Sequence, residues 1–225
     1  TDSYVAGGNG SGILIYGSHN LIYRSTIAGR GGDGLDVLGN DTAIYNSTIA
    51  GYGDGILIYG SHNLIYYSNV TGRSGYGVYV WGDDNLIYRS DVTGGSDGIY
   101  ITGSHTAIYR SDVTGYGDGS LIYGSDNNIT DSYVAGYDGA GINVVTGNDN
   151  TIYYSNVTSE GGAGVIITGS NNTIYRSNIA ASGNGIYVTD SYNNVTGSNI
   201  TDGSDSIYIQ SSHNHIIRSP LTTIK

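Results

Sequence analysis

Residues 12–29 read GILIYGSHNLIYRSTIAG, and near copies of this stretch recur along the whole chain. A serine near the end of each copy marks the repeat, and successive serines are 21 to 23 residues apart. This column contains Ser3, Ser25, Ser47, Ser68, Ser90, Ser111, Ser132, Ser155, Ser177, Ser198 and Ser219. A regular period of about 20 residues is typical of a solenoid, in which each repeat stacks on the one before it.

Three short apolar runs make up each repeat, with the patterns Gly-Ile-x-Ile, Asn-x-Ile and Ser-x-Val-x-Gly. Apolar residues at every second position indicate strands with one inward face, and the frequent Gly and Asn leave no room for helices. The sequence therefore predicts an all-β fold, a right-handed parallel β-helix of about ten rungs. Each rung has 21–23 residues and three short strands, and residues 1–225 form one domain without separate caps.

The same pattern carries a resemblance to a known family. The motif Asn-x-Ile-x-x-Ser-x-Ile-x-Gly, followed by Gly-Ile-x-Ile, resembles the parallel β-helix repeats of the pectate-lyase-like, carbohydrate-binding and sugar-hydrolase superfamily. In its use of Asp for Glu, its many Asn-x-Ser/Thr sequons and its Tyr-rich surface, the chain is most similar to repeat-containing surface and sheath proteins of archaea. The resemblance covers essentially the whole chain and implies the fold. It leaves function open, because such repeats occur in lyases, hydrolases, adhesins and passive scaffolds.

Composition restricts the partners. The formal net charge is −11 and the pI is near 4.4, so nucleic acid and anionic membranes are disfavoured by repulsion. No apolar run approaches the ~18 residues of a membrane span. The chain starts at Thr1 rather than Met, which indicates a removed signal segment or a fragment. Cations and neutral sugars remain as possible partners, and the expected location is extracellular or at the cell surface.

Two regular polar columns are expected to be structural. The serine column places a hydroxyl at the same turn of every coil, where it can bond to backbone groups of its own and the next coil. An asparagine column, in which Thr42 and Thr106 are substitutes, is expected to form an internal amide ladder. It contains Asn20, Asn63, Asn85, Asn127, Asn150, Asn172, Asn193 and Asn214.

Imidazole and carboxylate alternate in the position just before that asparagine column. Over six consecutive rungs the residues are His19, Asp41, His62, Asp84, His105 and Asp126. Three interpretations stay open: residues tolerated in an exposed turn, a charge ladder that raises the His pKa values, or ligands for Zn²⁺, Cu²⁺ or Ni²⁺.

A second acidic column precedes the Gly-Ile step and contains Asp33, Asp54, Asp97 and Asp118. Carboxylates one rung apart repel each other unless a cation or water lies between them. Hard oxygen ligands of this kind suit Ca²⁺, which is the one cofactor that the sequence suggests. The alternative is a set of solvated turn residues.

Aromatic residues fill outward columns and are the candidate interface. Two columns share one strand face, which predicts an exposed apolar stripe. Stacking of Tyr along the rod, lateral packing of protein and stacking on sugar rings all remain open explanations. The candidate interface residues are Tyr16, Tyr59, Trp81, Tyr79, Tyr100, Tyr187 and Tyr208.

Nine sequons make N-glycosylation an expectation. Their frequency is about twice the chance value for this composition, and repetition multiplies any one of them. The candidate residues are Asn9, Asn40, Asn46, Asn69, Asn128, Asn156, Asn171, Asn194 and Asn199.

The regularity of the rungs argues against an enzyme. An active site on this fold needs an insertion that walls a cleft and carboxylates unique to a few rungs. No rung exceeds its neighbours by more than two residues, and the pair Asp83-Asp84 has no Gly-His-Gly or Arg-x-Lys companion. The sequence therefore predicts a protein without catalytic residues.

The resulting functional prediction is an extracellular structural protein whose partner is itself. Residues 1–5 and 218–221 occupy equivalent positions of the repeat, so the coils are expected to dock end to end as well as laterally. The product is a filament, sheath or surface layer. The alternatives are a carbohydrate-binding, adhesin-like rod and an engineered repeat scaffold.

Overall fold

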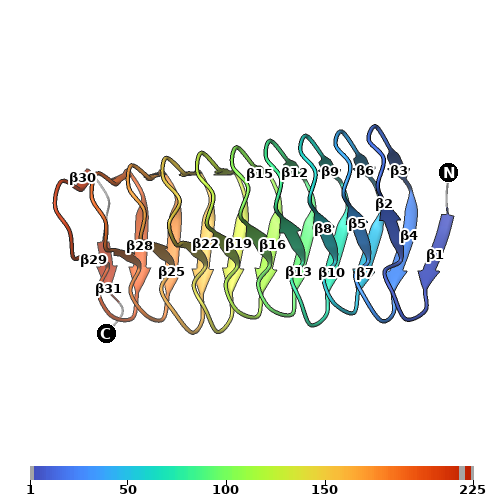
Figure 1. Ribbon diagram of the computed structural model, residues 1–225. Helices are drawn as coiled ribbons and strands as arrows, with labels where there is room; N and C mark the ends of the chain where they lie inside the picture. Colours follow the sequence, from blue (N-terminus) through green and yellow to red (C-terminus); the bar gives the residue numbers. More distant parts are fainter. Residues whose placement is uncertain (1–2, 218–220, 224–225) are drawn as a thin grey trace.

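The computed structural model describes residues 3–217 and 221–223. The chain winds into a rod whose N-terminal and C-terminal coils lie at opposite ends (Figure 1). Every strand pairs in parallel with its equivalent one coil away, so that Ile22 lies beside Ile44 and Ile44 beside Ile65. Three parallel sheets of 11, 10 and 10 strands run along the rod, which confirms the predicted all-β solenoid with three strands per rung.

Sheet A has the Ser-x-Val-x-Gly strands. They are β1 (Ser3–Gly7), β4 (Ser25–Gly29), β7 (Thr48–Gly51), β10 (Asn69–Gly72), β13 (Asp91–Gly94), β16 (Asp112–Gly115), β19 (Tyr133–Gly136), β22 (Asn156–Ser159), β25 (Asn178–Ala181), β28 (Asn199–Asp202) and β31 (Leu221–Thr223).

Sheet B has the Gly-Ile-x-Ile strands. They are β2 (Ile13–Ile15), β5 (Leu35–Val37), β8 (Ile56–Ile58), β11 (Val78–Val80), β14 (Ile99–Ile101), β17 (Ser120–Ile122), β20 (Ile142–Val144), β23 (Val165–Ile167), β26 (Ile186–Val188) and β29 (Ile207–Ile209).

Sheet C has the Asn-x-Ile strands. They are β3 (Leu21–Tyr23), β6 (Ala43–Tyr45), β9 (Leu64–Tyr66), β12 (Leu86–Tyr88), β15 (Ala107–Tyr109), β18 (Asn128–Thr130), β21 (Thr151–Tyr153), β24 (Thr173–Tyr175), β27 (Asn194–Thr196) and β30 (His215–Ile217). Among the described residues, no helix could span a membrane.

The predicted Ile and Val columns form the core. Each strand turns alternate side chains inward, and the inward residues of the three sheets make one continuous cluster. Ser120 is the polar exception, since its side chain is fully buried and its hydroxyl has no hydrogen-bond partner. It occupies the position that Ile99 and Ile142 hold on the neighbouring coils.

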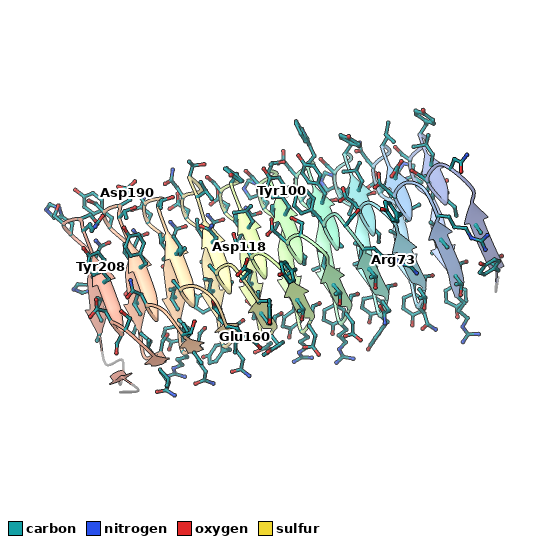
Figure 2. The ribbon with its side chains drawn as sticks, turned by 90° about the horizontal axis from the view of Figure 1, so that it is seen from below. Arg73, Tyr100, Asp118, Glu160, Asp190 and Tyr208 are labelled. Carbon is teal, nitrogen blue, oxygen red and sulfur yellow. The ribbon has the colours of Figure 1, made fainter. Side chains whose placement is uncertain are left out.

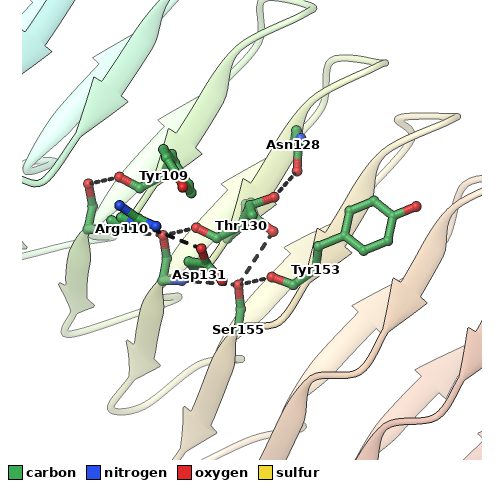
Figure 3. A network of polar contacts seen from close by, with 10 residues as sticks. Tyr109, Arg110, Asn128, Thr130, Asp131, Tyr153 and Ser155 are labelled. Atoms are coloured by element: carbon green, nitrogen blue, oxygen red, sulfur yellow. Dashed lines mark hydrogen bonds and ion pairs between the residues drawn. The ribbon is translucent and has the colours of Figure 1, made fainter.

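The serine column is a ladder of hydrogen bonds, as expected. The N–H of Ser132 donates to Oγ of Ser155 at 3.3 Å, and that hydroxyl donates to the carbonyl of Tyr153 at 2.9 Å (Figure 3). The same two bonds recur along the rod, for instance at Ser47 and Ser68. Each serine therefore satisfies backbone groups at the turn between sheets C and A.

The asparagine ladder differs from the expected pairing of amide with amide. From Asn63 onward, Oδ1 of the asparagine accepts the backbone N–H of the preceding coil, as between Asn127 and Thr106 at 2.8 Å. Nδ2 of several of them donates to the carbonyl of a turn glycine, as from Asn127 to Gly103 at 3.2 Å, whereas Nδ2 of Asn63 and Asn150 has no partner. At Thr42 and Thr106 the hydroxyl has no partner, because the shorter side chain cannot make the same bonds.

A third ladder lies in the turn between sheets B and C and was not foreseen from the sequence. Oδ1 of Asn40 accepts from Ser61 at 2.8 Å, Oγ of Ser61 accepts from Asp83 at 3.0 Å, and Oδ1 of Asp83 accepts from Ser104 at 2.7 Å. Asp83, one half of the Asp83-Asp84 pair, is therefore a backbone acceptor within this ladder.

Candidate functional site

The alternating His and Asp column occupies left-handed backbone positions. His19, Asp41, His62 and Asp84 have φ between 53° and 59°, and the same angle recurs at His105. Asn, Asp and His enter this region several times more readily than other residues with a Cβ atom. The backbone angle of the turn therefore favours these residue types in this column, although Arg24, Tyr67 and Arg89 adopt a similar angle after the sheet C strands.

Within this column the side chains meet only in pairs. Nδ1 of His19 lies 3.6 Å from Oδ2 of Asp41, and the equivalent His62–Asp84 and His105–Asp126 distances are 3.7 and 3.9 Å. All six side chains are exposed. Among the described residues, no three His, Asp or Glu side chains are grouped so as to hold a metal ion. Metal binding by this column stays a prediction.

The second acidic column links neighbouring coils. Oδ1 of Asp33 accepts the N–H of Asp54 at 2.7 Å, and Oδ1 of Asp54 accepts that of Tyr76 at 2.7 Å. Asp97 and Asp118 make the equivalent bonds to the next coil at 2.7 and 2.6 Å. These carboxylates are thus backbone acceptors, and a Ca²⁺ role for them stays a prediction.

Glycine is required where these carboxylates touch the next coil. A Cβ atom on Gly53 would lie 2.5 Å from Oδ1 of Asp33, and one on Gly117 would lie 2.5 Å from Oδ1 of Asp97. Each glycine lets the carboxylate approach the backbone closely enough to accept its hydrogen bond.

Asp36 is a site residue that the sequence analysis missed. It lies on β5 in the outward column of sheet B, beside Leu14 and Leu57 on the adjacent coils. Oγ of Ser11 donates to Oδ2 of Asp36 at 2.8 Å, while Oδ1 is buried without a hydrogen-bond partner. The signal was present in the sequence, because Asp36 is the only acidic residue in an otherwise apolar, aromatic and amide column.

Burial raises the pKa values of this acidic region. Desolvation, with repulsion from Asp33 and Asp36, raises the pKa of Asp54 to about 6. Desolvation also raises the pKa of Asp36 and that of Asp97, with further contributions from Asp33 and Asp118 respectively. The charges that raise these three pKa values are other carboxylates.

Six aromatic side chains beside these acids form a connected surface, which we call the aromatic platform. They project from β11 and β14 and from residues that flank β8, β11 and β17. Figure 2 shows Tyr100 near the middle of the rod. The platform consists of Tyr59, Tyr76, Tyr79, Trp81, Tyr100 and Tyr123.

The rings of the platform support one another. Tyr76 stacks on Tyr100 with centroids 4.8 Å apart, and Tyr79 meets Tyr100 edge to face at 4.9 Å. Trp81 is tilted against Tyr59 at 6.1 Å and against Tyr79 at 6.0 Å. Trp81 is nevertheless 56% exposed, so the inner rings hold outer rings whose faces remain open to solvent.

Tyr76 joins the platform to the acidic column. It occupies the position between Asp54 and Asp97 on adjacent coils, and both carboxylates raise its pKa after desolvation. Desolvation and the neighbouring Tyr rings and Asp97 raise the pKa of Tyr100 to about 12. The platform is therefore an apolar surface with carboxylates at its edge.

The remaining candidate interface residues lie apart from the platform. Tyr187 and Tyr208 stack on each other at 5.3 Å on β26 and β29. Tyr16, after β2, is 74% exposed. The structure thus brings together Tyr59, Tyr79, Trp81 and Tyr100 of the predicted set and adds Tyr76 and Tyr123.

A second aromatic surface runs along sheet C, where Tyr residues stack between coils. Tyr23, Tyr45, Tyr66, Tyr88 and Tyr109 have successive centroids 4.9 to 5.3 Å apart, so stacking along the rod, one of the three explanations left open by the sequence, occurs in this column. Arginines follow these strands and lie over the rings, as Arg110 does at 4.9 Å from Tyr109. The packed rings leave few ring faces free for a ligand.

A groove of about 520 Å³ lies where sheet C meets sheet A. Arg89 bonds to the Tyr67 hydroxyl at this groove, and the contact lowers the pKa of Tyr67. The next arginine along, Arg110, pairs with Asp131 at 3.6 Å (Figure 3). The groove is lined by Tyr45, Asn46, Tyr67, Ser68, Asn69, Arg89 and Asp91.

The predicted glycosylation residues lie at the surface. Eight of the nine asparagines are exposed and Asn194 is partly exposed. In three sequons of sheet A, the strand alternation places Asn and Thr on the same outward face, as at Asn69 and Thr71. At Asn128 and Asn194 the Thr hydroxyl of the sequon donates to Oδ1 of the asparagine. Glycosylation itself stays a prediction.

The fold and these repeats assign the chain to a family. Residues 1–80 and 76–221 match the family described as right handed beta helix region, and the chain belongs to it. No curated protein sequence matches the chain significantly.

Solved structures share the fold at low sequence identity. The A-module of mannuronan C-5 epimerase AlgE4 from Azotobacter vinelandii has a TM-score of 0.68 and 15% identity, over 86% of this chain and 63% of that one. The periplasmic alginate epimerase AlgG has a TM-score of 0.74 and 12% identity, over 94% and 62%. A tailspike protein mutant of Escherichia coli bacteriophage HK620, in complex with hexasaccharide, has a TM-score of 0.57 and 12% identity, over 87% and 46%. The chain thus spans less than two thirds of each of these proteins.

Proposed function

We propose that this protein binds a linear glycan on the aromatic platform of sheet B. The observation that carries the proposal is the set of six mutually supported rings on four consecutive coils, with Trp81 56% exposed. Flat apolar ring faces beside polar groups are what a sugar ring stacks on and hydrogen-bonds to. Coils are ~4.8 Å apart, so the platform extends ~15 Å along the rod and suits an oligosaccharide rather than a single sugar.

Fold likeness is consistent with this proposal. Two similar structures are named as epimerases, of mannuronan and of alginate, and a third is a tailspike in complex with hexasaccharide. At sequence identities of 12 to 15%, these likenesses show that the fold is shared and do not determine the activity of this chain. That the chain binds without catalysis, and that it acts outside the cell, both remain part of the proposal.

Calorimetric titration with linear hexasaccharides tests the platform. We expect Trp81→Ala to weaken binding at least tenfold, because a central aromatic anchor commonly contributes about 2 kcal/mol. Tyr116→Ala is the matched control: Tyr116 is 59% exposed and rests on Tyr137, away from the platform. Equal losses in both variants, or no loss in either, would contradict the proposal.

Self-assembly is the second candidate, and the platform favours a lateral form of it. Exposed aromatic rings on one face can bury against another copy as well as against a sugar. If the rods associate through this face, sedimentation will show oligomers that Trp81→Ala disperses and that a bound hexasaccharide also disperses. End-to-end docking stays a prediction, and part of it concerns residues 218–220, which lie outside the described residues.

A further inference from the structure

The edge of the aromatic platform is anionic and has no countercharge in the described chain. Asp54 and Asp97 flank Tyr76, and Asp33 and Asp36 lie one coil further along sheet B. Of the described ion pairs, none involves these four carboxylates. Asp97 is 9% exposed, so little water is available to screen its charge.

No arginine of the described residues forms an ion pair with these carboxylates. Four of the six in the described residues follow sheet C strands and rest on Tyr rings there. The other two, Arg30 and Arg73, begin turns between sheets A and B and line a separate hollow with Tyr4 and Tyr52. None of them is among the groups that shift the pKa of Asp36, Asp54 or Asp97. The carboxylates at the platform edge therefore have no arginine partner among the described residues.

We propose that the aromatic platform selects glycans that carry protonated amino groups, such as glucosamine polymers, over glycans that carry carboxylates. This inference rests on the proposed function and names the substrate class of the same site. An ammonium group bound beside Tyr76 is attracted by the carboxylates of Asp54 and Asp97 and by the electron-rich Tyr76 ring, while the sugar rings stack along the platform toward Trp81. A uronate placed there meets like charge without any cation to compensate.

The position of the acids makes selection by charge effective. The carboxylates are held by hydrogen bonds to the next coil, as Oδ1 of Asp97 is by the N–H of Asp118, so they cannot swing away from a bound sugar. A cation near both carboxylates is attracted by each of them, and an anion is repelled by each of them.

Three hexamers that differ in charge test the inference: glucosamine, N-acetylglucosamine and galacturonate. By calorimetry near neutral pH and at low salt, we expect glucosamine to bind about tenfold more tightly than galacturonate, with the neutral hexamer between them. At about 1 M salt, where the Debye length is about 3 Å, this preference should fall to near zero. Galacturonate binding equal to or tighter than glucosamine would overturn the inference.

Amide variants separate charge from structure. Asn at position 54 keeps an Oδ1 acceptor for Tyr76, as Asn184 does for Asp205 at 3.3 Å in the same column. In the double variant Asp54→Asn with Asp97→Asn, we expect the ratio of glucosamine to galacturonate affinity to fall about tenfold. Asp84→Asn, on the outer turn, is the matched control and should leave the ratio unchanged. An unchanged ratio in the double variant would also overturn the inference.

Further outcomes distinguish this inference from the proposed function. Suppose that all three hexamers bind, that Trp81→Ala weakens the binding of each, and that their affinities do not follow their charge. The inference on charge then fails and the proposal of glycan binding stands. If none binds, the proposed function fails and the inference with it. If a hexalysine peptide binds the platform more tightly than the glucosamine hexamer, the platform serves a basic protein segment and the glycan assignment is wrong.

Discussion

Single residues in this rod are selected by the backbone position they occupy. Along each outer turn the chain adopts a left-handed angle, and Asp, His or Asn fills it on most coils, with Tyr192 as the exception at φ 64°. Asp33 and Asp54 are selected instead for a side-chain oxygen that reaches the next coil. Asp36 has neither of these roles, and it lies in the acidic region beside the platform.

Asp54→Asn is expected to stabilise the fold at alkaline pH and not at acid pH. The folded-state pKa of Asp54 is raised to about 6, so above that value the folded chain contains a disfavoured charge. Between about pH 6 and 4 the folded state binds the proton before the unfolded state does, and stability therefore rises as pH falls. The full shift corresponds to about 3 kcal/mol. Because Asp54 is partly exposed, solvent screening reduces this energy. We therefore expect Asp54→Asn to raise the free energy of unfolding at alkaline pH by about 1 kcal/mol.

Denaturant unfolding at about pH 8 and about pH 4 measures this difference. At pH 8 we expect Asp54→Asn to unfold at a higher denaturant concentration than wild type. At pH 4 we expect the two midpoints to be equal. A variant that is less stable than wild type at pH 8 would contradict the prediction, because it would show that the charged carboxylate stabilises the contact between the coils.

Ser120→Val is expected to raise stability by about 1–2 kcal/mol. The serine is fully buried with an unpartnered hydroxyl, and the adjacent coils carry Ile99 and Ile142 at the same position. Valine adds apolar contacts and removes the unsatisfied group. Chemical denaturation checks the prediction, and Ser120→Ala separates removal of the hydroxyl from filling of the space. A loss of stability in Ser120→Val would mean that the neighbouring coils have closed around the serine.

At the level of the elements, the sheets are held in register by three polar ladders as much as by the apolar columns. The strands of sheets B and C are three residues long, so most of each coil is turn. The Ser, Asn and turn ladders each pass one hydrogen bond from coil to coil through side chains. Buried turns need such partners because their backbone groups lack water.

Asn127→Ala is expected to cost about 2–4 kcal/mol. It removes the acceptor of the Thr106 N–H and the donor to the Gly103 carbonyl, both buried, and each unpaired group costs about 1–3 kcal/mol. The neighbouring exposed Asn128→Ala should change stability by about 0.5 kcal/mol or less. Thermal or denaturant unfolding compares the two, and a similar loss in both variants would show that the ladder contributes little.

For the elements, sequence reasoning succeeded where it relied on the repeat. The period predicted the pairing of Ile22 with Ile44, since equal spacing places equivalent residues side by side. It did not predict the hydrogen-bond partners within the asparagine ladder. A column of asparagines is compatible with amides that bond to one another and with amides that bond to the backbone. That choice depends on turn geometry, which left Asn127 within reach of Thr106.

Across the whole molecule, the faces formed by sheets B and C differ in charge and chemistry. Acids and open rings occupy sheet B, while stacked tyrosines covered by arginines occupy sheet C. The sequence could identify each column but not which columns adjoin across a turn. For that reason Asp36 and Tyr76 were absent from the predicted site, although both interrupt the pattern of their columns.

Emission of Trp81 during titration with the glucosamine hexamer tests the central claim most directly. Trp81 is the only tryptophan of the chain and lies within the platform, so its fluorescence reports on this surface alone. Our account predicts a saturable change in emission whose midpoint agrees with calorimetry and moves to higher hexamer concentration at high salt. Calorimetric binding with unchanged Trp81 emission, or no binding at all, would contradict it.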